Sequence, residues 1–279
     1  YIYLVPAFAE LFYAKINKTV RDSGKEKAFH TLIAISNFLR KFGIDLRKKL
    51  FKSVHAAFGG RLRKIVCGGA PIRPEVGKFF DDVGISLING YGITECSPLV
   101  CANHDKYNDY HTVGIKLRCI DWRIDSPNEE GIGEICVKGD IVMMGYYKQP
   151  EKTSEVLKDG WFYTGDYGYI NDKDQLLITG RKKNVIVLSN GKNIYPEEIE
   201  GYIQGIEYVS EVVVRSQRNA KGEESSLVAE LFLTEEHTND EVLKDIRKVT
   251  AELPVYKQIS NVIIRETEFN KTTSRKIKR

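Results

Sequence analysis

The sequence predicts an α/β and β-rich larger part followed by a small α+β domain, and three observations support this prediction. A strand, a helix and a second strand follow one another between residues 63 and 88, which is typical of a βαβ layer. Short apolar segments separated by turns fill residues 111–180 and favour a small distorted β-barrel. After Arg181, helical and strand patterns mix over about a hundred residues, an ordinary domain size.

We therefore expect a larger part at residues 1–180, a hinge at 181–183 and a small α+β domain at 184–279. The larger part divides into an α/β segment at 1–110 and a barrel-like segment at 111–180. Because the pattern changes at Arg181-Lys-Lys, the boundary between the domains is placed there.

Residues 8–58 are expected to be mostly helical, because apolar residues recur there at helical spacing. Glycines interrupt the pattern at Gly43 and at Gly59-Gly60. The apolar stripe consists of Phe29, Leu32, Ile33, Ile35 and Leu39.

The predicted βαβ layer begins with a short strand at Arg63 that runs into a glycine turn at 68–69. A helix over 74–82 follows, with Pro74 in its first turn, where the missing N–H would have no partner in any case. The second strand covers Ile85–Ile88 and ends at Asn89, where a glycine-rich loop begins.

The last hundred or so residues read as a hairpin followed by mixed helices and strands. The hairpin is expected at Asn184–Leu188, with its turn at Ser-Asn-Gly. The remaining predicted elements are a helix at 196–204, strands at 209–214 and 227–233, a helix at 240–253 and a strand at 262–265.

The composition is that of a soluble globular protein, with 42% hydrophobic and 29% charged residues. No segment is apolar for long enough to span a bilayer, and no cleavable signal opens the chain. The five cysteines form no CxxC pair, which predicts reduced thiols and a cytoplasmic protein. The histidines form no zinc-binding group, and because the chain starts without methionine we interpret it as a fragment.

Positive charge is concentrated in residues 15–64, which contain 14 Lys or Arg and only three Asp or Glu. This basic region fits a peripheral contact with an anionic membrane, at its inner surface, or with another polyanion. A solvated helical face is the competing interpretation, because the basic residues alternate with apolar ones at helical spacing. No nucleic-acid partner is expected.

The stretch NGYGITECS, which begins at Asn89, carries the first candidate site. Two glycines, Gly90 and Gly92, would let the main chain approach a ligand, and Tyr91 offers a flat face to a base. Thr94 could donate to a phosphate oxygen, and Glu95 supplies the hard oxygen that Mg²⁺ prefers. A polar turn at the end of a strand would look similar.

Two further motifs also follow strands, and each has an ordinary structural interpretation. The turn Gly69-Ala70-Pro71 could simply connect a strand to a helix. In Thr-Gly-Asp166 the carboxylate could accept bonds from two vicinal hydroxyls or could cap a turn. Two basic segments, at 180–200 and 270–279, could be an exposed linker and tail.

Taken together, the motifs favour a functional site over these structural interpretations. The order and spacing of one family are matched by five motifs: GGAP, NGYGITE, TGD, GRKKNVIVLSNGKNIYPEEIE and KTTSRKIKR. The chain resembles the adenylate-forming enzymes: acyl-CoA synthetases, luciferases and the adenylation domains of peptide synthetases. LSNGKNIYPEEIE and VPAFAELFYAKI look most like the long-chain fatty acid–CoA ligases. The resemblance covers the chain end to end but only the C-terminal portion of the family's length, namely the remainder of the large domain and the small mobile domain.

The resemblance implies ATP/AMP, Mg²⁺ and coenzyme A as ligands. It places Asp166 and Arg181 at the ribose, Tyr91 against adenine, Thr94 at the phosphates and Glu95 at Mg²⁺. The nucleotide and the acyl group would be framed by Gly69, Ala70, Pro71, Asn89, Gly90 and Gly92.

Three more roles follow from the resemblance in the small domain. Lys276 of KTTSRK would stabilise the charge that develops when a carboxylate attacks ATP. Lys183 would be the hinge residue between the two half-reactions. The turn at Ser189, Asn190 and Gly191 would line the path of coenzyme A. The tail departs from the family pattern because Asn270 stands for proline and Arg275 for glycine, which leaves the conformation of that loop open.

The implied activity is ATP-dependent activation of a fatty acid as acyl adenylate, followed by thioester formation with coenzyme A. The family's upstream phosphate-binding loop has no match here, so this piece is not expected to complete adenylation alone. The alternatives are an acyl–acyl carrier protein synthetase, an aryl or short-chain acyl-CoA ligase, or a decayed relative that only binds nucleotide.

Overall fold

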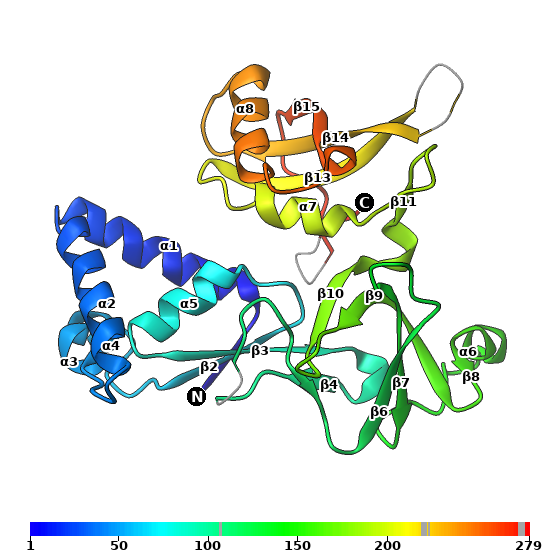
Figure 1. Ribbon diagram of the computed structural model, residues 1–279, viewed down its shortest axis with the longest axis horizontal. Coiled ribbons are helices and arrows are strands. Elements are labelled where there is room, and N and C mark those ends of the chain that lie inside the picture. Colours follow the sequence, from blue (N-terminus) through cyan, green and yellow to red (C-terminus); the bar gives the residue numbers. More distant parts are fainter. Residues whose placement is uncertain (106–107, 219–221, 223, 273–276) are drawn as a thin grey trace. The chain divides into compact units, whose positions relative to one another are not determined.

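The computed structural model describes residues 1–105, 108–218, 222, 224–272 and 277–279, and it is a mixed α/β structure with several sheets (Figure 1). It divides into two compact units. The first unit comprises residues 1–164 and 169–178, and the second comprises residues 165–168 and 179–279.

A five-stranded sheet in the order β1-β2-β3-β4-β5 organises the first half of the first unit. The pairs β1–β2 and β2–β3 are parallel, and the pairs β3–β4 and β4–β5 are antiparallel. The strands are β1 (Ile2–Leu4), β2 (Lys64–Gly68), β3 (Ser86–Gly92), β4 (Leu99–Ala102) and β5 (Ile115–Lys116).

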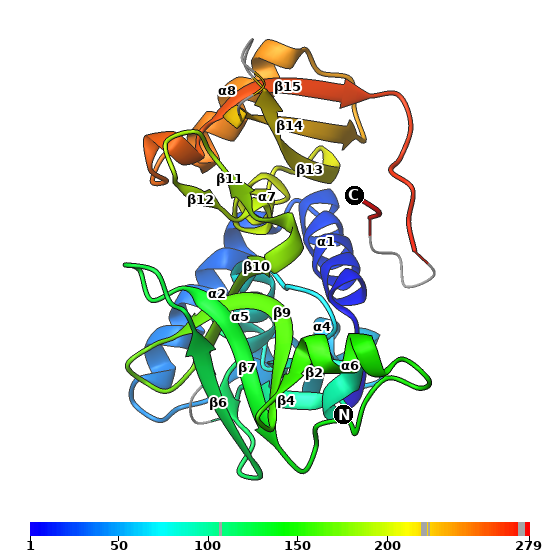
Figure 2. The same cartoon turned by 90° about the vertical axis from the view of Figure 1, so that its right-hand side faces the viewer.

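Helices pack against this sheet and bury an aromatic-rich core (Figure 2). The core includes Phe51, Phe79 and Phe80, with Phe29 packed against it from α2. The helices are α1 (Pro6–Asp22), α2 (Glu26–Arg40), α3 (Arg47–Leu50), α4 (Lys52–Ala57) and α5 (Pro74–Asp82). None of the helices among the described residues combines the length and apolar character needed to cross a membrane.

The β-rich segment forms a second sheet in the order β10-β9-β7-β6, with β8 paired to β9. No pairing closes this path into a barrel within the described ranges, so the segment predicted as a distorted barrel is an open sheet. Its elements are β6 (Ile120–Asp125), β7 (Gly133–Gly139), α6 (Pro150–Val156), β8 (Leu157–Lys158), β9 (Trp161–Ile170) and β10 (Leu176–Arg181).

The second unit is built on a three-stranded sheet in the order β13-β14-β15, against which α7 and α8 pack. Helix α8 begins with a capping box, in which Thr238 Oγ1 accepts from Glu241 N and the Glu241 carboxylate accepts from Thr238 N. The elements are η2 (Lys182–Asn184), β11 (Ile186–Val187), β12 (Asn193–Ile194), α7 (Pro196–Ile203), β13 (Val209–Arg218), β14 (Glu224–Leu233), α8 (Asn239–Val249), η3 (Val255–Lys257) and β15 (Ile259–Arg265).

Most of the predicted elements are confirmed, including the helix at 74–82, whose observed bounds are Pro74–Asp82. The prediction that a loop begins at Asn89 is wrong, because β3 continues to Gly92. It continues because Gly90 pairs with Ala102 and Gly92 with Leu99 of a strand that the sequence reading did not include. Ile35, predicted within the apolar stripe of α2, is 48% exposed.

Candidate active site

The first candidate motif pair lies at one edge of the parallel strands. In the β2–β3 register, Cys67 is opposite Asn89 and Gly68 is opposite Gly90. The turn that follows β2 therefore begins beside the glycine-rich end of β3. The carboxyl ends of parallel strands are where α/β sheets bind ligands, and both motifs meet there.

The glycines at this edge of the sheet are required for different structural reasons. A Cβ at Gly90 would lie 3.0 Å from the Cys101 carbonyl oxygen, and one at Gly92 only 2.2 Å from that of Pro98. These two positions are therefore glycine because neighbouring backbone lies so close, a reason independent of any ligand. Gly69 has φ +89° and nothing within 4 Å of an added Cβ, so the backbone of this turn faces open space.

Asn89 holds an acceptor with no partner. Its side chain is buried, and Oδ1 receives no hydrogen bond within the described part of the chain. A buried acceptor left without a donor costs about 1–3 kcal/mol, so it fits a ligand that brings an N–H or O–H. Its place on β3 puts this acceptor beside Gly90, within the predicted nucleotide frame.

Tyr91 and Thr94 differ in exposure. Tyr91 is 8% exposed and packs in the core cluster that includes Cys96 and Val100, so only a small part of its ring is open to a base. Thr94 begins the 3₁₀ turn η1 (Thr94–Cys96) and is exposed, so its hydroxyl is available to a phosphate oxygen.

Glu95 is held from two directions by the segment that precedes α6. Its main-chain oxygen accepts a hydrogen bond from Met143 N at 2.8 Å. The Tyr146 hydroxyl donates to Glu95 Oε1 at 2.9 Å, and Tyr146 N donates to Thr153 Oγ1 at 2.9 Å. Burial raises the pKa of Tyr146, and the hydrogen bond to the Glu95 carboxylate raises it further.

The surroundings of Glu95 fit a magnesium ion held with a nucleotide. No three His, Cys, Asp or Glu side chains gather as a metal site among the described residues. Mg²⁺ is commonly held by one or two carboxylates, water and substrate phosphates, so one oriented carboxylate is a suitable donor set. Sequence reasoning identified Glu95 but missed Tyr146, because the two are separated by 51 positions and no local pattern links them.

Asp166 and Arg181, predicted to act at the ribose, are brought together in the second unit. Arg181 Nε lies 2.9 Å from Asp166 Oδ1. The Asp166 side chain is 5% exposed and that of Arg181 is 47% exposed. The buried carboxylate can accept hydrogen bonds from hydroxyl groups, and the half-exposed guanidinium can donate hydrogen bonds to a phosphate.

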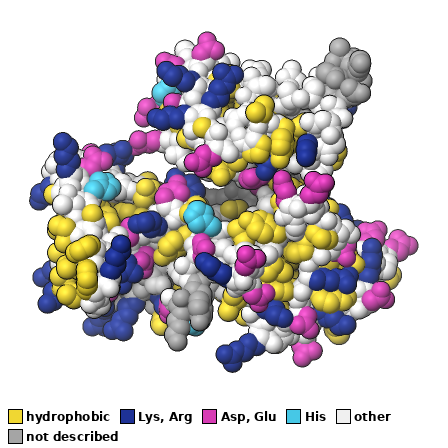
Figure 3. Space-filling model, in the orientation of Figure 1, with side chains coloured by type: hydrophobic (Ala, Val, Ile, Leu, Met, Phe, Trp, Pro, Cys, Tyr) yellow, Lys and Arg dark blue, Asp and Glu magenta, His cyan; other side chains and the backbone are white. Residues whose placement is uncertain are grey.

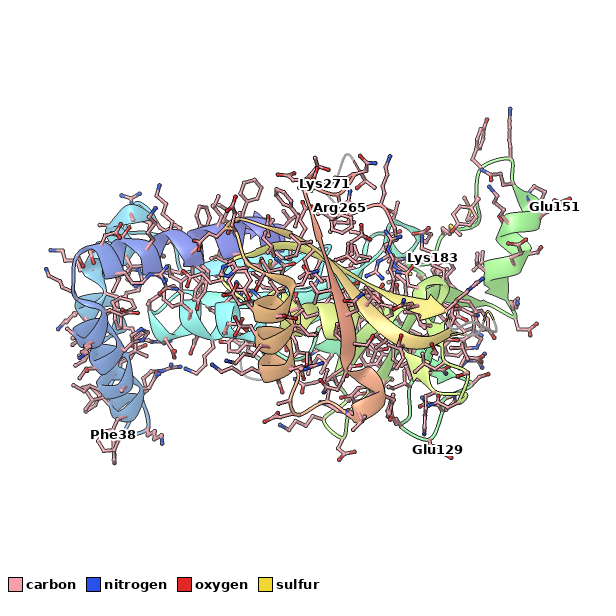
Figure 4. All side chains as sticks on the ribbon, turned by 90° about the horizontal axis from the view of Figure 1, so that it is seen from above. Phe38, Glu129, Glu151, Lys183, Arg265 and Lys271 are labelled. Carbon is pink, nitrogen blue, oxygen red and sulfur yellow. The ribbon has the colours of Figure 1, made fainter. Side chains whose placement is uncertain are left out.

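The hinge and hairpin candidates also lie in the second unit. Lys183 is exposed in η2 (Figure 4), and the next residue, Asn184, donates through Nδ2 to Glu197 Oε1 of α7. The Ser189-Asn190-Gly191 turn is closed by Gly191 N donating to Leu188 O at 2.8 Å, with Gly191 at φ +77°. All three turn residues are exposed.

Lys276 lies outside the described residues, but the chain on both sides of it is described. Before it, Lys271 is ion-paired with Glu211 and with Glu268 (Figure 4 labels Lys271). After it, Lys278 N donates to Asn270 O at 2.8 Å, and Lys271 forms a β-bridge with Ile277. The two flanks are thus joined to one another in the second unit.

The thiol groups of the cysteines have none of the roles described above. All five are free in the structure. Burial raises the pKa of Cys67, Cys101 and Cys136 to about 12 and that of Cys96 to about 11, so these four thiols are protonated near neutral pH.

Comparison with known proteins identifies the class. A family model described as AMP-binding enzyme matches residues 1–147, and one described as AMP-binding enzyme C-terminal domain matches residues 183–279. The chain belongs to the AMP-binding enzyme family, and the resemblance to adenylate-forming enzymes is confirmed.

Individual proteins of this family are similar to the chain in sequence or in structure. A long-chain-fatty-acid–CoA ligase from Haemophilus influenzae is 36% identical over 244 residues, covering 84% of this chain and 42% of that protein. The chloroplastic long-chain-fatty-acid–[acyl-carrier-protein] ligase AEE15 of Arabidopsis thaliana is 32% identical over 248 residues, covering 80% and 34%. The crystal structure of ATP-bound MatB from Rhodopseudomonas palustris superposes with a TM-score of 0.66 at 26% identity, covering 81% of this chain and 47% of that chain. The chain thus spans less than half the length of each.

Proposed function

We propose that this chain is the C-terminal part of an ATP-dependent long-chain fatty acid–CoA ligase. The observation that carries the proposal is the 36% identity to the Haemophilus influenzae ligase across 84% of the chain. Since that match spans 42% of the relative, the activity is proposed for the enzyme that contains this chain. The family's phosphate-binding loop has no match in this sequence, so the chain by itself is not expected to complete adenylation.

Each described site residue has one role in this proposal. Asn89 Oδ1 accepts from the nucleotide base, Tyr91 lies at its edge, and the Gly69-Ala70-Pro71 backbone frames the nucleotide and the acyl group. Asp166 accepts from the ribose hydroxyls while Arg181 neutralises phosphate charge. The buried position of the Asn89 acceptor and the 2.9 Å Asp166–Arg181 pair support these roles.

The first half-reaction joins two anions, so positive charge has to meet the charge that develops at the α-phosphate. Thr94 donates to a phosphate oxygen, and Glu95 would hold Mg²⁺, which would supply Lewis-acid charge there. Lys276 supplies the remaining positive charge. A fatty carboxylate then displaces pyrophosphate and becomes an acyl adenylate.

In the second half-reaction the thiol of coenzyme A attacks the carbonyl carbon of the acyl adenylate, the new C–S bond forms, and AMP leaves. Rotation about Lys183 would exchange the Lys276 segment for the Ser189–Gly191 turn, which would line the pantetheine path. The exposure of Lys183 and of the turn supports this role, because neither is fixed by burial.

The Arabidopsis relative supports a second candidate, a ligase that uses an acyl carrier protein as thiol acceptor. The enzyme containing this chain is incubated with ATP, Mg²⁺ and a long-chain fatty acid, and then with coenzyme A or holo-acyl carrier protein. Mass spectrometry of the thioester is expected to show acyl-CoA. Thioester on the carrier protein alone would establish the second candidate, and preference for an aryl or short-chain acid would contradict the substrate class. Nucleotide binding with no acyl adenylate from any acid would indicate a decayed relative.

A further inference from the structure

The outer end of α2 presents apolar side chains to solvent. Phe38 is 59% exposed and Phe42, which follows the helix, is 67% exposed, with their rings in edge contact at 5.2 Å between centroids. Ile35 and Ile44 are also exposed. Figure 4 shows Phe38 at the end of the helix with its ring directed away from it. We call these four residues the Phe38 tip.

The tip is distinct from the face of α2 that builds the core. Phe29, Leu32 and Ile33 of the same helix pack against the aromatic core of the first unit. Ile35 and Phe38 are three positions apart and so share another face of the helix. A surface helix of a globular protein usually has a single apolar stripe, so a second apolar face needs a separate explanation.

Four lysines without an ion pair among the described residues lie within or directly after the tip in the chain, in the segment that runs from the end of α2 into α3 and α4. Lys41, Lys48, Lys49 and Lys52 are exposed and make no ion pair within the described residues. Figure 3 shows hydrophobic side chains beside Lys and Arg over this end of the first unit.

The nearby acids are already neutralised, so the charge of these lysines is not cancelled locally. Asp45 pairs with Arg47 at 2.7 Å, and Asp81 pairs with Arg40 at 2.8 Å and with Arg47 at 3.0 Å. The hydrogen bonds from Arg47 lower the pKa of Asp45 to about 2, so this carboxylate stays ionised and paired.

We propose that the Phe38 tip docks on an anionic phospholipid surface, with Phe38 and Phe42 in the interface and the four lysines at the headgroups. Exposed aromatic rings on a segment rich in unpaired lysines suit the boundary between acyl chains and phosphates. Protein–protein interfaces are depleted in lysine, so a lipid surface fits this composition better than a second copy of the chain or another protein segment. The basic region predicted a charge contact only, and the structure adds the apolar element.

This inference does not rest on the ligase proposal, because docking is measured without ATP, acid or thiol. The chain is mixed with sedimentable vesicles of phosphatidylcholine alone and of phosphatidylcholine with phosphatidylglycerol, at low and at physiological salt. We expect binding to the anionic vesicles only, weakening as salt screens the lysines. No binding to anionic vesicles at low salt would overturn the proposal.

Variants separate the apolar from the electrostatic contribution. Phe38→Ser with Phe42→Ser should lower vesicle binding about tenfold or more, because two aromatic side chains no longer enter the interface. Lys48→Gln with Lys49→Gln should lower it about tenfold and reduce the salt dependence. The matched control, Tyr147→Ser with Val255→Ser, removes two side chains that are 83% and 89% exposed elsewhere. Equal loss in this control would contradict the docking site.

A fluorescence measurement identifies the occupant even if a double variant folds poorly. In Phe38→Trp, anionic vesicles should shift the added emission to the blue, and brominated acyl chains should quench it, after subtraction of the signal from the two native tryptophans. Emission that is already blue without vesicles, or that changes with protein concentration, would show that a protein segment or a second copy covers the tip.

Discussion

Tyr146 donates a hydrogen bond from its hydroxyl to Oε1 of Glu95 at 2.9 Å, joining the segment before α6 to the 3₁₀ turn that carries the proposed magnesium ligand. The Met143 N to Glu95 O bond at 2.8 Å holds the backbone of the same residue. One contact is made to the carboxylate and the other to the backbone of the same residue, and orientation of a ligand by its hydrogen-bond partners is a large part of metal affinity.

Tyr146→Phe should therefore weaken magnesium use without unfolding the protein. We expect the Mg²⁺ concentration for half-maximal pyrophosphate exchange to rise about tenfold. Calorimetric binding of ATP with Mn²⁺ should weaken to a similar extent. Tyr147→Phe is the matched control, since this neighbouring ring is 83% exposed. An unchanged metal requirement in Tyr146→Phe would show that the hydrogen bond is only structural.

Loss of the buried carboxylate at 166 should cost nucleotide affinity. Asp166→Asn keeps the shape but removes the charge that pairs with Arg181 at 2.9 Å, and it weakens the acceptor for ribose hydroxyls. We expect AMP binding, measured by calorimetry, to fall about tenfold or more. Asp172→Asn in the exposed turn is the control. If 2′,3′-dideoxy nucleotide lost as much affinity as AMP in Asp166→Asn, ribose contact would not be the cause.

Glu200 on α7 should make stability depend on pH. Burial raises its pKa from 4.5 to about 7, although Arg279 pairs with it and Val214 N donates to it at 2.6 Å. Between these values the folded chain retains a proton that the unfolded chain has lost. The free energy of unfolding therefore falls as pH rises from about 4.5 to about 7, by up to about 3 kcal/mol.

Glu200→Gln mimics the protonated side chain, so it should flatten this part of the pH profile and stabilise the chain most near pH 7. Urea unfolding followed by circular dichroism at several pH values measures the effect. Glu236→Gln, an exposed carboxylate before α8, should leave the wild-type profile in place. A Glu200→Gln profile as steep as the wild type would contradict the assignment.

A proline at the proposed hinge should affect the two half-reactions unequally. Lys183→Pro restricts φ and disfavours the helical region for Lys182, in the turn η2 (Lys182–Asn184). We expect one half-reaction to slow by more than tenfold relative to the other in single-turnover assays. Lys183→Ala keeps the backbone freedom and serves as the control. Equal slowing of both steps in Lys183→Pro would argue for misfolding instead of a blocked rotation.

The sequence predicted the elements better than the contacts between them. The helix at 74–82 was predictable because proline marks its start and the apolar spacing is local. The end of β3 was not, because Gly90 pairs with both β2 and β4, and Tyr91 and Gly92 pair with β4, whereas their composition is typical of a turn.

In the candidate site, too, residues within motifs could be predicted and long-range contacts could not. Motif order located Asp166 and Arg181, and adjacent strands then bring them to 2.9 Å. Tyr146 could not be predicted, since its role depends on a contact across 51 positions. The missing partner of Asn89 Oδ1 is visible only once burial is known. Lys276 lies outside the described residues, and its role stays a prediction.

Lys276→Ala should slow the first half-reaction, adenylation, and leave the second, thioester formation, intact. Adenylation should fall by about 10²–10³ through loss of a preorganised cation, while thioester formation from supplied acyl adenylate survives. Lys278→Ala, also in the basic tail and exposed, is the control. Equal loss of both steps in Lys276→Ala would remove the role proposed for this lysine.

The most direct test of the ligase proposal is ATP–pyrophosphate exchange by the enzyme that contains this chain, measured with a panel of carboxylic acids. We predict magnesium-dependent exchange that is fastest with long-chain fatty acids. Exchange supported only by amino acids, or absent with every fatty acid, would contradict it.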